Sequence, residues 1–179
     1  MSKILISGYY GFANAGDEAM LTAIIESLRQ VEKNVELTVL SGNPEDTAAK
    51  HQVCSVYRFN PLGIIRAMKD SELIISGGGS LLQDVTSKRS LLYYLSIIGL
   101  GKFFGKKVML FAQGIGPIRA KWARKLTSLV CNEADLITVR DSESAAELIE
   151  MGVKPEKITV TADSVLSLNP VTKECGQYL

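Results

Sequence analysis

The sequence predicts an α/β fold with a Rossmann-like, doubly wound parallel sheet, and three observations support this. Short apolar runs alternate with longer amphipathic segments along most of the chain. The apolar runs are continuous, as in strands that helices cover on both faces. Turn residues, glycine above all, follow several of these runs. Such βαβ units have right-handed crossovers and build one parallel sheet, here of roughly six or seven strands.

The predicted elements follow one another with short turns between them. We expect strands at residues 3–7, 35–41, 52–57 (the weakest candidate), 72–76, 107–112, 136–139 and 157–161. We expect helices at residues 17–30, 61–69, 89–104, 119–134 and 141–151. The first helix carries a wide apolar stripe, Pro61 suits a first helical turn, and Gly152 suits a helix end.

Length, composition and charge indicate one globular domain whose net charge creates no strong electrostatic field. The chain has 179 residues, of which 46% are hydrophobic and 22% charged, and its net charge is +1. This balance argues against nucleic acid as a partner. We expect the domain over residues 1–168. Residues 169–179 are expected to begin a crossing into a second domain that the chain lacks.

The cysteines and the lone histidine give no sign of a metal site or a disulfide framework. Cys54, Cys131 and Cys175 are widely spaced, without a CxxC pair or a histidine cluster. We therefore expect no metal, with Cys54 buried in a strand and His51 on the surface. The N-terminus has no signal-peptide pattern, which favours a cytoplasmic protein. The uncharged segment 90–101 is too short to span a membrane, so a buried helix and a membrane-contacting surface both remain open.

Unusual loops follow three predicted strands, at the sheet edge where open α/β sheets bind ligands. They are residues 8–16, 77–83 and 113–118. After the first loop, Asp17 and Glu18 open a helix, and two carboxylates there would repel a phosphate by about 1–4 kcal/mol per charge pair. This argues against dinucleotide binding and favours sugar hydroxyls, with Asp17 as a candidate base. In the alternative interpretation, both carboxylates only cap the helix.

The other loops carry weaker signals. Three consecutive glycines including Gly78 and Gly79 permit close backbone approach, either to a ligand or within a tight turn. Gln83 and Gln113 are polar groups beside these turns. Arg140 directly follows a strand, where it could hold a carboxylate or phosphate, or simply pair with the next residue.

Taken in order, these loops resemble a known enzyme family. The motifs are residues 8–18 (GYYGFANAGDE), 76–84 (SGGGSLLQD), 112–117 (AQGIGP) and 140–144 (RDSES), with a weaker 162–164 (ADS). The set resembles the polysaccharide pyruvyl transferase family, most closely its CsaB-type members. The resemblance implies one half of a GT-B-like two-domain enzyme that transfers pyruvate from phosphoenolpyruvate to two hydroxyls of one sugar, forming a cyclic ketal.

The resemblance also implies a biological setting. The acceptor would be N-acetylmannosamine in a lipid-linked or polymeric cell-wall glycan, and the product would anchor surface-layer (S-layer) proteins. The enzyme would then work at the inner face of the cell membrane, with possible peripheral membrane association. Phosphoenolpyruvate would be the co-substrate, with no other cofactor and with most of its site in the missing domain. This chain alone is expected to be inactive.

The expected site has three groups of residues. Asp17 is the candidate catalytic base, and Arg140 is the candidate donor-binding residue. The acceptor-binding candidates are Tyr10, Asn14, Gly16, Glu18, Gly78, Gly79, Gln83 and Gln113. Two alternatives remain: half of a GT-B nucleotide-sugar glycosyltransferase, and a non-catalytic, flavodoxin-like binding module. The sequence does not indicate an oligomeric state.

Overall fold

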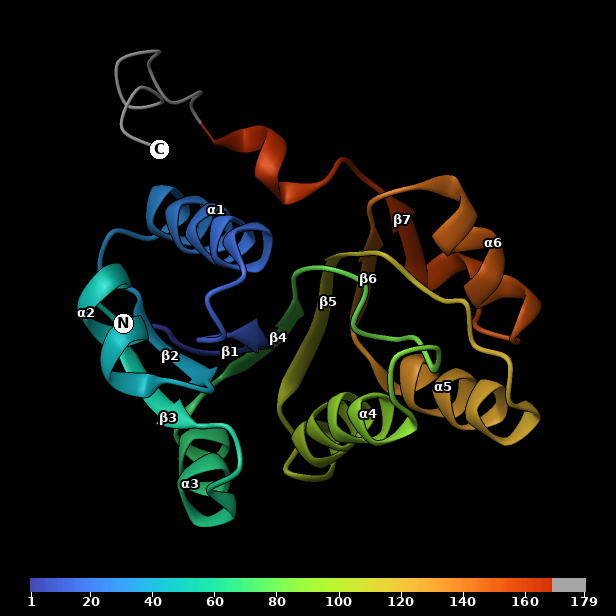
Figure 1. Cartoon of the computed structure of the whole chain (residues 1–179), viewed down its shortest axis with the longest axis horizontal. Helices are drawn as coiled ribbons and strands as arrows, with labels where there is room; N and C mark the ends of the chain where they lie inside the picture. Colours follow the sequence, from blue (N-terminus) through green and yellow to red (C-terminus); the bar gives the residue numbers. More distant parts are fainter. Residues whose placement is uncertain (169–179) are drawn as a thin grey trace.

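A computed structural model describes residues 1–168 and shows a single parallel sheet with helices packed on both faces (Figure 1). The strands are β1 (Lys3–Tyr10), β2 (Glu36–Ser41), β3 (Cys54–Tyr57), β4 (Leu73–Gly77), β5 (Lys107–Gln113), β6 (Leu136–Val139) and β7 (Ile158–Val160). Their order across the sheet is β3-β2-β1-β4-β5-β6-β7, and all pairings are parallel. The predicted Rossmann-like α/β fold is confirmed.

The helices alternate with these strands as expected, with one addition. They are α1 (Ala15–Val31), α2 (Pro44–His51), α3 (Pro61–Asp70), α4 (Lys88–Phe103), α5 (Lys121–Glu133) and α6 (Ser142–Glu150), followed by the short 3₁₀ segments η1 (Pro155–Lys157) and η2 (Ser164–Ser167). Helix α2 was not predicted. Its only buried residue is Thr47, so it has no apolar stripe to reveal it, although Asn43 caps it and Pro44 begins it.

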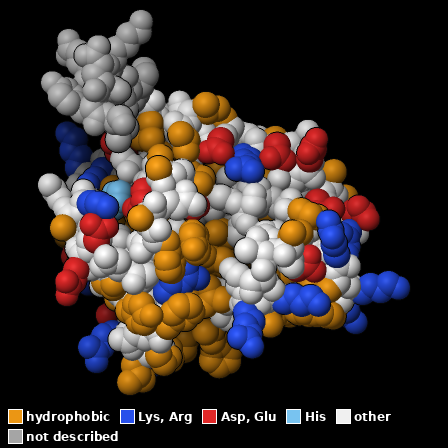
Figure 2. Space-filling model, viewed as in Figure 1, with side chains coloured by type: hydrophobic (Ala, Val, Ile, Leu, Met, Phe, Trp, Pro, Cys, Tyr) orange, Lys and Arg blue, Asp and Glu red, His pale blue; other side chains and the backbone are white. Residues whose placement is uncertain are grey.

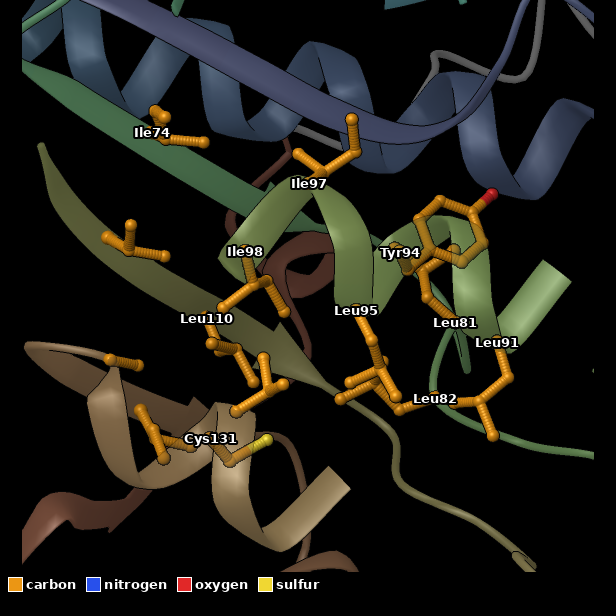
Figure 3. Close-up of a cluster of buried hydrophobic side chains, with 14 of the residues drawn as sticks. Ile74, Leu81, Leu82, Leu91, Tyr94, Leu95, Ile97, Ile98, Leu110 and Cys131 are labelled. Atoms are coloured by element: carbon orange, nitrogen blue, oxygen red, sulfur yellow. The ribbon is translucent and has the colours of Figure 1, made fainter. Parts of the chain in front are cut away.

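The core has two layers, one on each face of the sheet. Ile4 and Ile6 of β1 pack in the cluster that contains the buried face of α1, whereas Leu5, between them, packs in the opposite cluster. The cluster that contains Leu5 is the larger of the two, and it joins the sheet to α3, α4 and α5. Figure 3 shows its centre, where side chains of α4 lie against β4 and β5. The continuous apolar runs in the sequence therefore reflect strands covered on both faces.

Helix α4 contains the uncharged segment whose environment the sequence left open. It buries Leu91, Tyr94, Leu95, Ile97 and Ile98 in the core. In the described part of the chain, no helix is long and apolar enough to cross a membrane. The burial confirms the first alternative, a buried helix. The domain boundary expected at residue 169 lies outside the described residues.

The order of the strands locates the edge where a ligand would bind. The chain order runs outward in opposite directions from β1 and β4, which are direct neighbours paired from Ile4–Leu73 to Ser7–Ser76. This is the topological switch point, where open parallel sheets form a crevice at the carboxyl ends of their strands. The loops that follow β1 and β4 are the first loop and the triple-glycine loop singled out from the sequence.

Candidate functional site

A cavity of about 340 Å³ opens between the loops after β1 and β4. Its lining combines one carboxylate, four small polar side chains and two aromatic rings. The lining residues are Tyr9, Asp17, Ser80, Leu81, Gln83, Thr86, Ser90 and Tyr94. We call it the Asp17 cavity. Polar groups beside aromatic rings are the side chains expected of a site for a polyhydroxylated ligand.

Among the described residues, Asp17 is the only acidic one that lines this cavity. Asn14 caps α1 by accepting a hydrogen bond from Gly16 N at 3.1 Å, so Asp17 is not the capping residue. Among the described residues, no side chain or backbone group donates a hydrogen bond to the Asp17 carboxylate. Burial, and then the neighbouring charge of Glu18, raise the pKa of Asp17. A carboxylate in this state is suited to accept a proton.

Gly79 makes room for this carboxylate. A Cβ atom on Gly79 would lie 3.0 Å from Oδ1 of Asp17, and its φ of +61° also favours glycine. The triple-glycine loop therefore reaches Asp17 across the switch point. Gly78, beside it, packs over the hydroxyl of Tyr10 rather than over the cavity.

Glu18, predicted to bind the acceptor, is occupied by contacts within the protein. Its Oε1 accepts a hydrogen bond from Gly11 N at 2.8 Å, and its Oε2 lies 3.2 Å from Nε2 of His51. The prediction that His51 is a surface residue was wrong, because α2 brings its side chain against α1, where only 9% of it is exposed. Glu18 thus holds the first loop in place. Cys54, predicted to be buried, is exposed on β3.

Tyr10 and Gln113 lie inside the protein and not in the cavity lining. Strand β1 continues through Tyr10, which is fully buried and donates its hydroxyl hydrogen to Gly77 O at 2.6 Å. The exposed tyrosine of the pair is Tyr9. Gln113 is also fully buried, and its Nε2 donates to both oxygens of Ser76, at 2.9 Å to the carbonyl and 2.8 Å to the hydroxyl. Both residues support the loops instead of reaching a ligand in this arrangement.

The remaining candidates lie at the cavity or beside it. Gln83 is in the lining, where its amide exchanges hydrogen bonds with Thr86, at 2.7 Å to the hydroxyl and 2.9 Å from the backbone N–H. Asn14 caps α1 and Gly16 directly precedes the cavity-lining Asp17 in its first turn. Sequence analysis missed Ser80, Thr86 and Ser90, because hydroxyl side chains in a turn give no pattern of their own.

Arg140 lines a second cavity of about 340 Å³, next to the first. The two cavities share Ser80, whose hydroxyl accepts a hydrogen bond from Arg140 Nη2 at 3.2 Å. Arg140 also pairs with Asp163 at 3.3 Å and Asp141 at 3.4 Å. Asp141 itself caps α6 through Ser144 N. The interpretation that Arg140 pairs with the next residue is confirmed, and its binding of a carboxylate or phosphate ligand stays a prediction.

Comparisons with known proteins agree with this architecture. The solved structure of Anabaena Alr3699/HepE with UDP-glucose is similar, with a TM-score of 0.60 and 13% identity over 91% of this chain and 44% of that one. UDP-GlcNAc 2-epimerase from Neisseria meningitidis has a TM-score of 0.58 and 13% identity, over 93% of this chain and 47% of that one. The lipopolysaccharide outer core galactosyltransferase WaaB has a TM-score of 0.52 and 15% identity, over 96% of this chain and 46% of that one. This chain spans about half the length of these structures.

These likenesses show the fold, which is that of GT-B glycosyltransferases and of related epimerases. No curated protein sequence matches the chain. The family model described as polysaccharide pyruvyl transferase, however, matches residues 14–174, which include Asp17, the loops after β4 and β5, and Arg140. The chain therefore belongs to the polysaccharide pyruvyl transferase family.

Proposed function

We propose that this chain is the acceptor-binding half of an enzyme that transfers pyruvate from phosphoenolpyruvate to two hydroxyls of one sugar. The observation that carries this proposal is the Asp17 carboxylate, which has a raised pKa and receives no hydrogen bond from the described residues, although it lines a polar cavity. A base in this position can take the proton of a sugar hydroxyl and activate its oxygen.

The other side chains of the Asp17 cavity suit a sugar. Ser80, Gln83, Thr86 and Ser90 offer hydroxyl and amide groups that donate and accept hydrogen bonds. Tyr9 and Tyr94 offer ring faces for the apolar side of a sugar ring. We propose N-acetylmannosamine in a cell-wall glycan precursor as the acceptor, and anchoring of S-layer proteins as the use of the product. Activity at the inner face of the cell membrane belongs to the same proposal.

Arg140 supports an adjacent site for the donor. It lines the neighbouring cavity, and its Nη2 bonds to the Ser80 hydroxyl that both cavities share. Its two acidic partners balance much of its charge, so Arg140 alone is too weak a site for the phosphate and carboxylate of phosphoenolpyruvate. We therefore propose that a C-terminal half supplies most of the donor contacts.

The proposed reaction begins when Asp17 removes the proton of one hydroxyl. The hydroxyl oxygen bonds to C2 of the donor, and the methylene carbon gains a proton from an acid. The C2–O bond to phosphate then breaks, phosphate leaves with the bonding pair, and the second hydroxyl loses its proton as it closes the ketal. Cationic groups that hold the leaving phosphate stabilise this departure.

The proposal is tested in a two-domain protein that carries this chain as its N-terminal half. Asp17→Asn is expected to lower pyruvyl transfer by ~10²–10⁴-fold, as is usual when a general base is lost. Asp70→Asn, an exposed carboxylate on α3, is the matched control. Turnover of Asp17→Asn within a few-fold of wild type would exclude Asp17 as the base. Sugar transfer from a nucleotide-sugar donor would favour the glycosyltransferase alternative.

A further inference from the structure

A buried arginine lies beside the Asp17 cavity and has no role in the reaction above. Arg58 directly follows β3 at the carboxyl edge of the sheet, and only 4% of its surface is exposed. Its Nη2 donates to the hydroxyl of Tyr94 at 3.3 Å. Its Nε and Nη1 have no hydrogen-bond partner among the described residues. Arg58 also forms no salt bridge within the part of the chain that the structure describes.

Aromatic rings take the place of an acidic partner. The guanidinium carbon lies 4.4 Å from the ring centre of Tyr93, 5.2 Å from that of Phe59 and 5.3 Å from that of Phe12. The rings of Tyr94 and Tyr9 lie at 5.5 Å and 5.9 Å. Each such contact contributes about 0.5–2 kcal/mol. Ring faces attract the positive charge, but they leave the N–H groups of Nε and Nη1 without acceptors.

An unpaired buried cation is costly, so its presence at a ligand edge needs a reason. Removing a charged group from water costs several kcal/mol unless hydrogen bonds and an opposite charge compensate it. The hydroxyls of Ser7 and Tyr93 are also buried without a hydrogen-bond partner among the described residues, and the ring of Tyr93 lies against the guanidinium. One oxyanion would satisfy both Nε and Nη1 of Arg58, in the fork that a guanidinium offers to phosphate.

The cover over Arg58 is thin and adjoins the Asp17 cavity. The rings of Tyr9 and Phe12 stack at 4.4 Å on the first loop, and these residues are 40% and 42% exposed. Exposed side chains change rotamer within nanoseconds, so this pair can swing aside without disturbing the core. Tyr9 and Tyr94 contact Arg58 and also line the cavity, so a ligand bound beside Asp17 lies next to this cover.

The figures show the setting of this cover. The hydroxyl of Tyr94, which Arg58 contacts, points away from the hydrophobic cluster of α4 in Figure 3. Figure 2 shows hydrophobic side chains gathered over α3 and toward α4 on this face of the molecule. The exposed members next to Arg58 in sequence are Tyr57 and Phe59. The positive charge of Arg58 therefore lies below a largely apolar surface.

We propose that Arg58 is an anion anchor that binds a phosphate group carried by the sugar ligand of the Asp17 cavity. The phosphate would displace the stacked rings and accept hydrogen bonds from Nε and Nη1. The acceptor is favoured over phosphoenolpyruvate as the source because two of the rings around Arg58, those of Tyr9 and Tyr94, line the Asp17 cavity, whereas none of the rings lines the Arg140 cavity. The identity of the ligand as a sugar rests on the proposed function, whereas the binding of a phosphate group by Arg58 does not.

The test compares ligands with and without phosphate on the full 179-residue chain. Calorimetry would measure binding of N-acetylmannosamine, N-acetylmannosamine 1-phosphate, inorganic phosphate and phosphoenolpyruvate. Wild type is expected to bind the sugar phosphate about tenfold or more tightly than the sugar, as a hydrogen bond to a charged group implies. Arg58→Gln is expected to lose that preference. Arg66→Gln, an exposed arginine on nearby α3, should keep it.

Arg58→Lys provides a second variant that keeps the charge, in case the glutamine variant does not fold. It is expected to retain part of the preference, because lysine cannot form the fork. A wild-type chain without any phosphate preference, or an Arg58→Gln chain that keeps it, overturns the anchor. Selective loss of phosphoenolpyruvate binding instead overturns its assignment to the acceptor. The difference in inorganic phosphate binding between wild type and Arg58→Gln reports on Arg58, whereas the Asp17→Asn activity test reports on the proposed function.

Discussion

Ser80 accepts a hydrogen bond from Nη2 of Arg140 at 3.2 Å, and this contact joins the two cavities at the carboxyl edge of the sheet. Ser80 follows the glycines after β4, and Arg140 directly follows β6. A sugar beside Asp17 and an anion beside Arg140 would therefore meet at one hydroxyl. This geometry suits a transfer between two ligands held in neighbouring cavities.

Ser80→Ala is expected to lower kcat/KM for pyruvyl transfer about tenfold in the two-domain protein, because one hydrogen bond to a charged group is lost. The fold should be unaffected, since Ser80 is exposed. Initial rates at varied donor and acceptor concentrations would measure the effect. Ser96→Ala removes an exposed hydroxyl on α4 whose one hydrogen bond among the described residues is to Tyr93 O, and it serves as the control. Equal rates for both variants would contradict a shared role for Ser80.

Asp17→Asn is expected to stabilise the chain at neutral pH. Burial and Glu18 raise the pKa of Asp17 in the folded state, so folding favours the protonated form. The ionised carboxylate therefore costs stability above its ordinary pKa of about 3.9, and the cost vanishes where the acid is protonated in both states. Denaturant midpoints between pH 4 and 8 should show a growing advantage of the variant with rising pH. A constant difference across this range would contradict the interpretation.

Glu18→Ala tests whether Glu18 is a structural residue. The substitution leaves Gly11 N and His51 without their shared partner, and a lost partner for partly buried polar groups costs about 1–3 kcal/mol. Urea unfolding of the chain should report this loss. Glu26→Ala, an exposed position on the same helix, should change stability little. If the two variants are equally stable, Glu18 does not hold the first loop.

The sequence predicted the sheet and most helices because their signals are local. Continuous apolar runs marked the strands, and the stripe that begins with Met20 and Leu21 marked α1. Helix α2 has no apolar stripe, and its start signal at Asn43 and Pro44 also fits a simple turn. Its omission explains why His51 was placed on the surface, since only the helix brings it to Glu18.

The candidate site was predicted less well because it depends on side-chain direction. Asp17, Gln83 and Arg140 do line cavities. Tyr10 does not, because β1 extends three residues beyond the predicted end and its alternation turns Tyr10 inward and Tyr9 outward. Arg58 gave no signal, since a charged residue after a weak strand is ordinarily solvated. Its burial results from aromatic residues contributed by three separate segments.

Asp135→Asn is expected to make the chain less stable at neutral pH but not in acid. Burial opposes ionisation of Asp135, yet hydrogen bonds from Lys102, Val108 N and Lys107 outweigh it and lower the pKa to about 2. Because the folded pKa lies below the ordinary value, the carboxylate contributes stability above about pH 4, and this contribution is lost between pH 4 and 2.

The loss at neutral pH should be about 1 kcal/mol, because the Asp135 side chain is 29% exposed and solvent weakens its ion pairs. Urea unfolding of both proteins between pH 3 and 7 would measure it, with the exposed Glu133→Gln as the control. The two curves should converge toward acid pH, since protonated aspartate and asparagine are both uncharged. Parallel curves would mean that Asp135 acts through its shape and its backbone contact rather than through its charge.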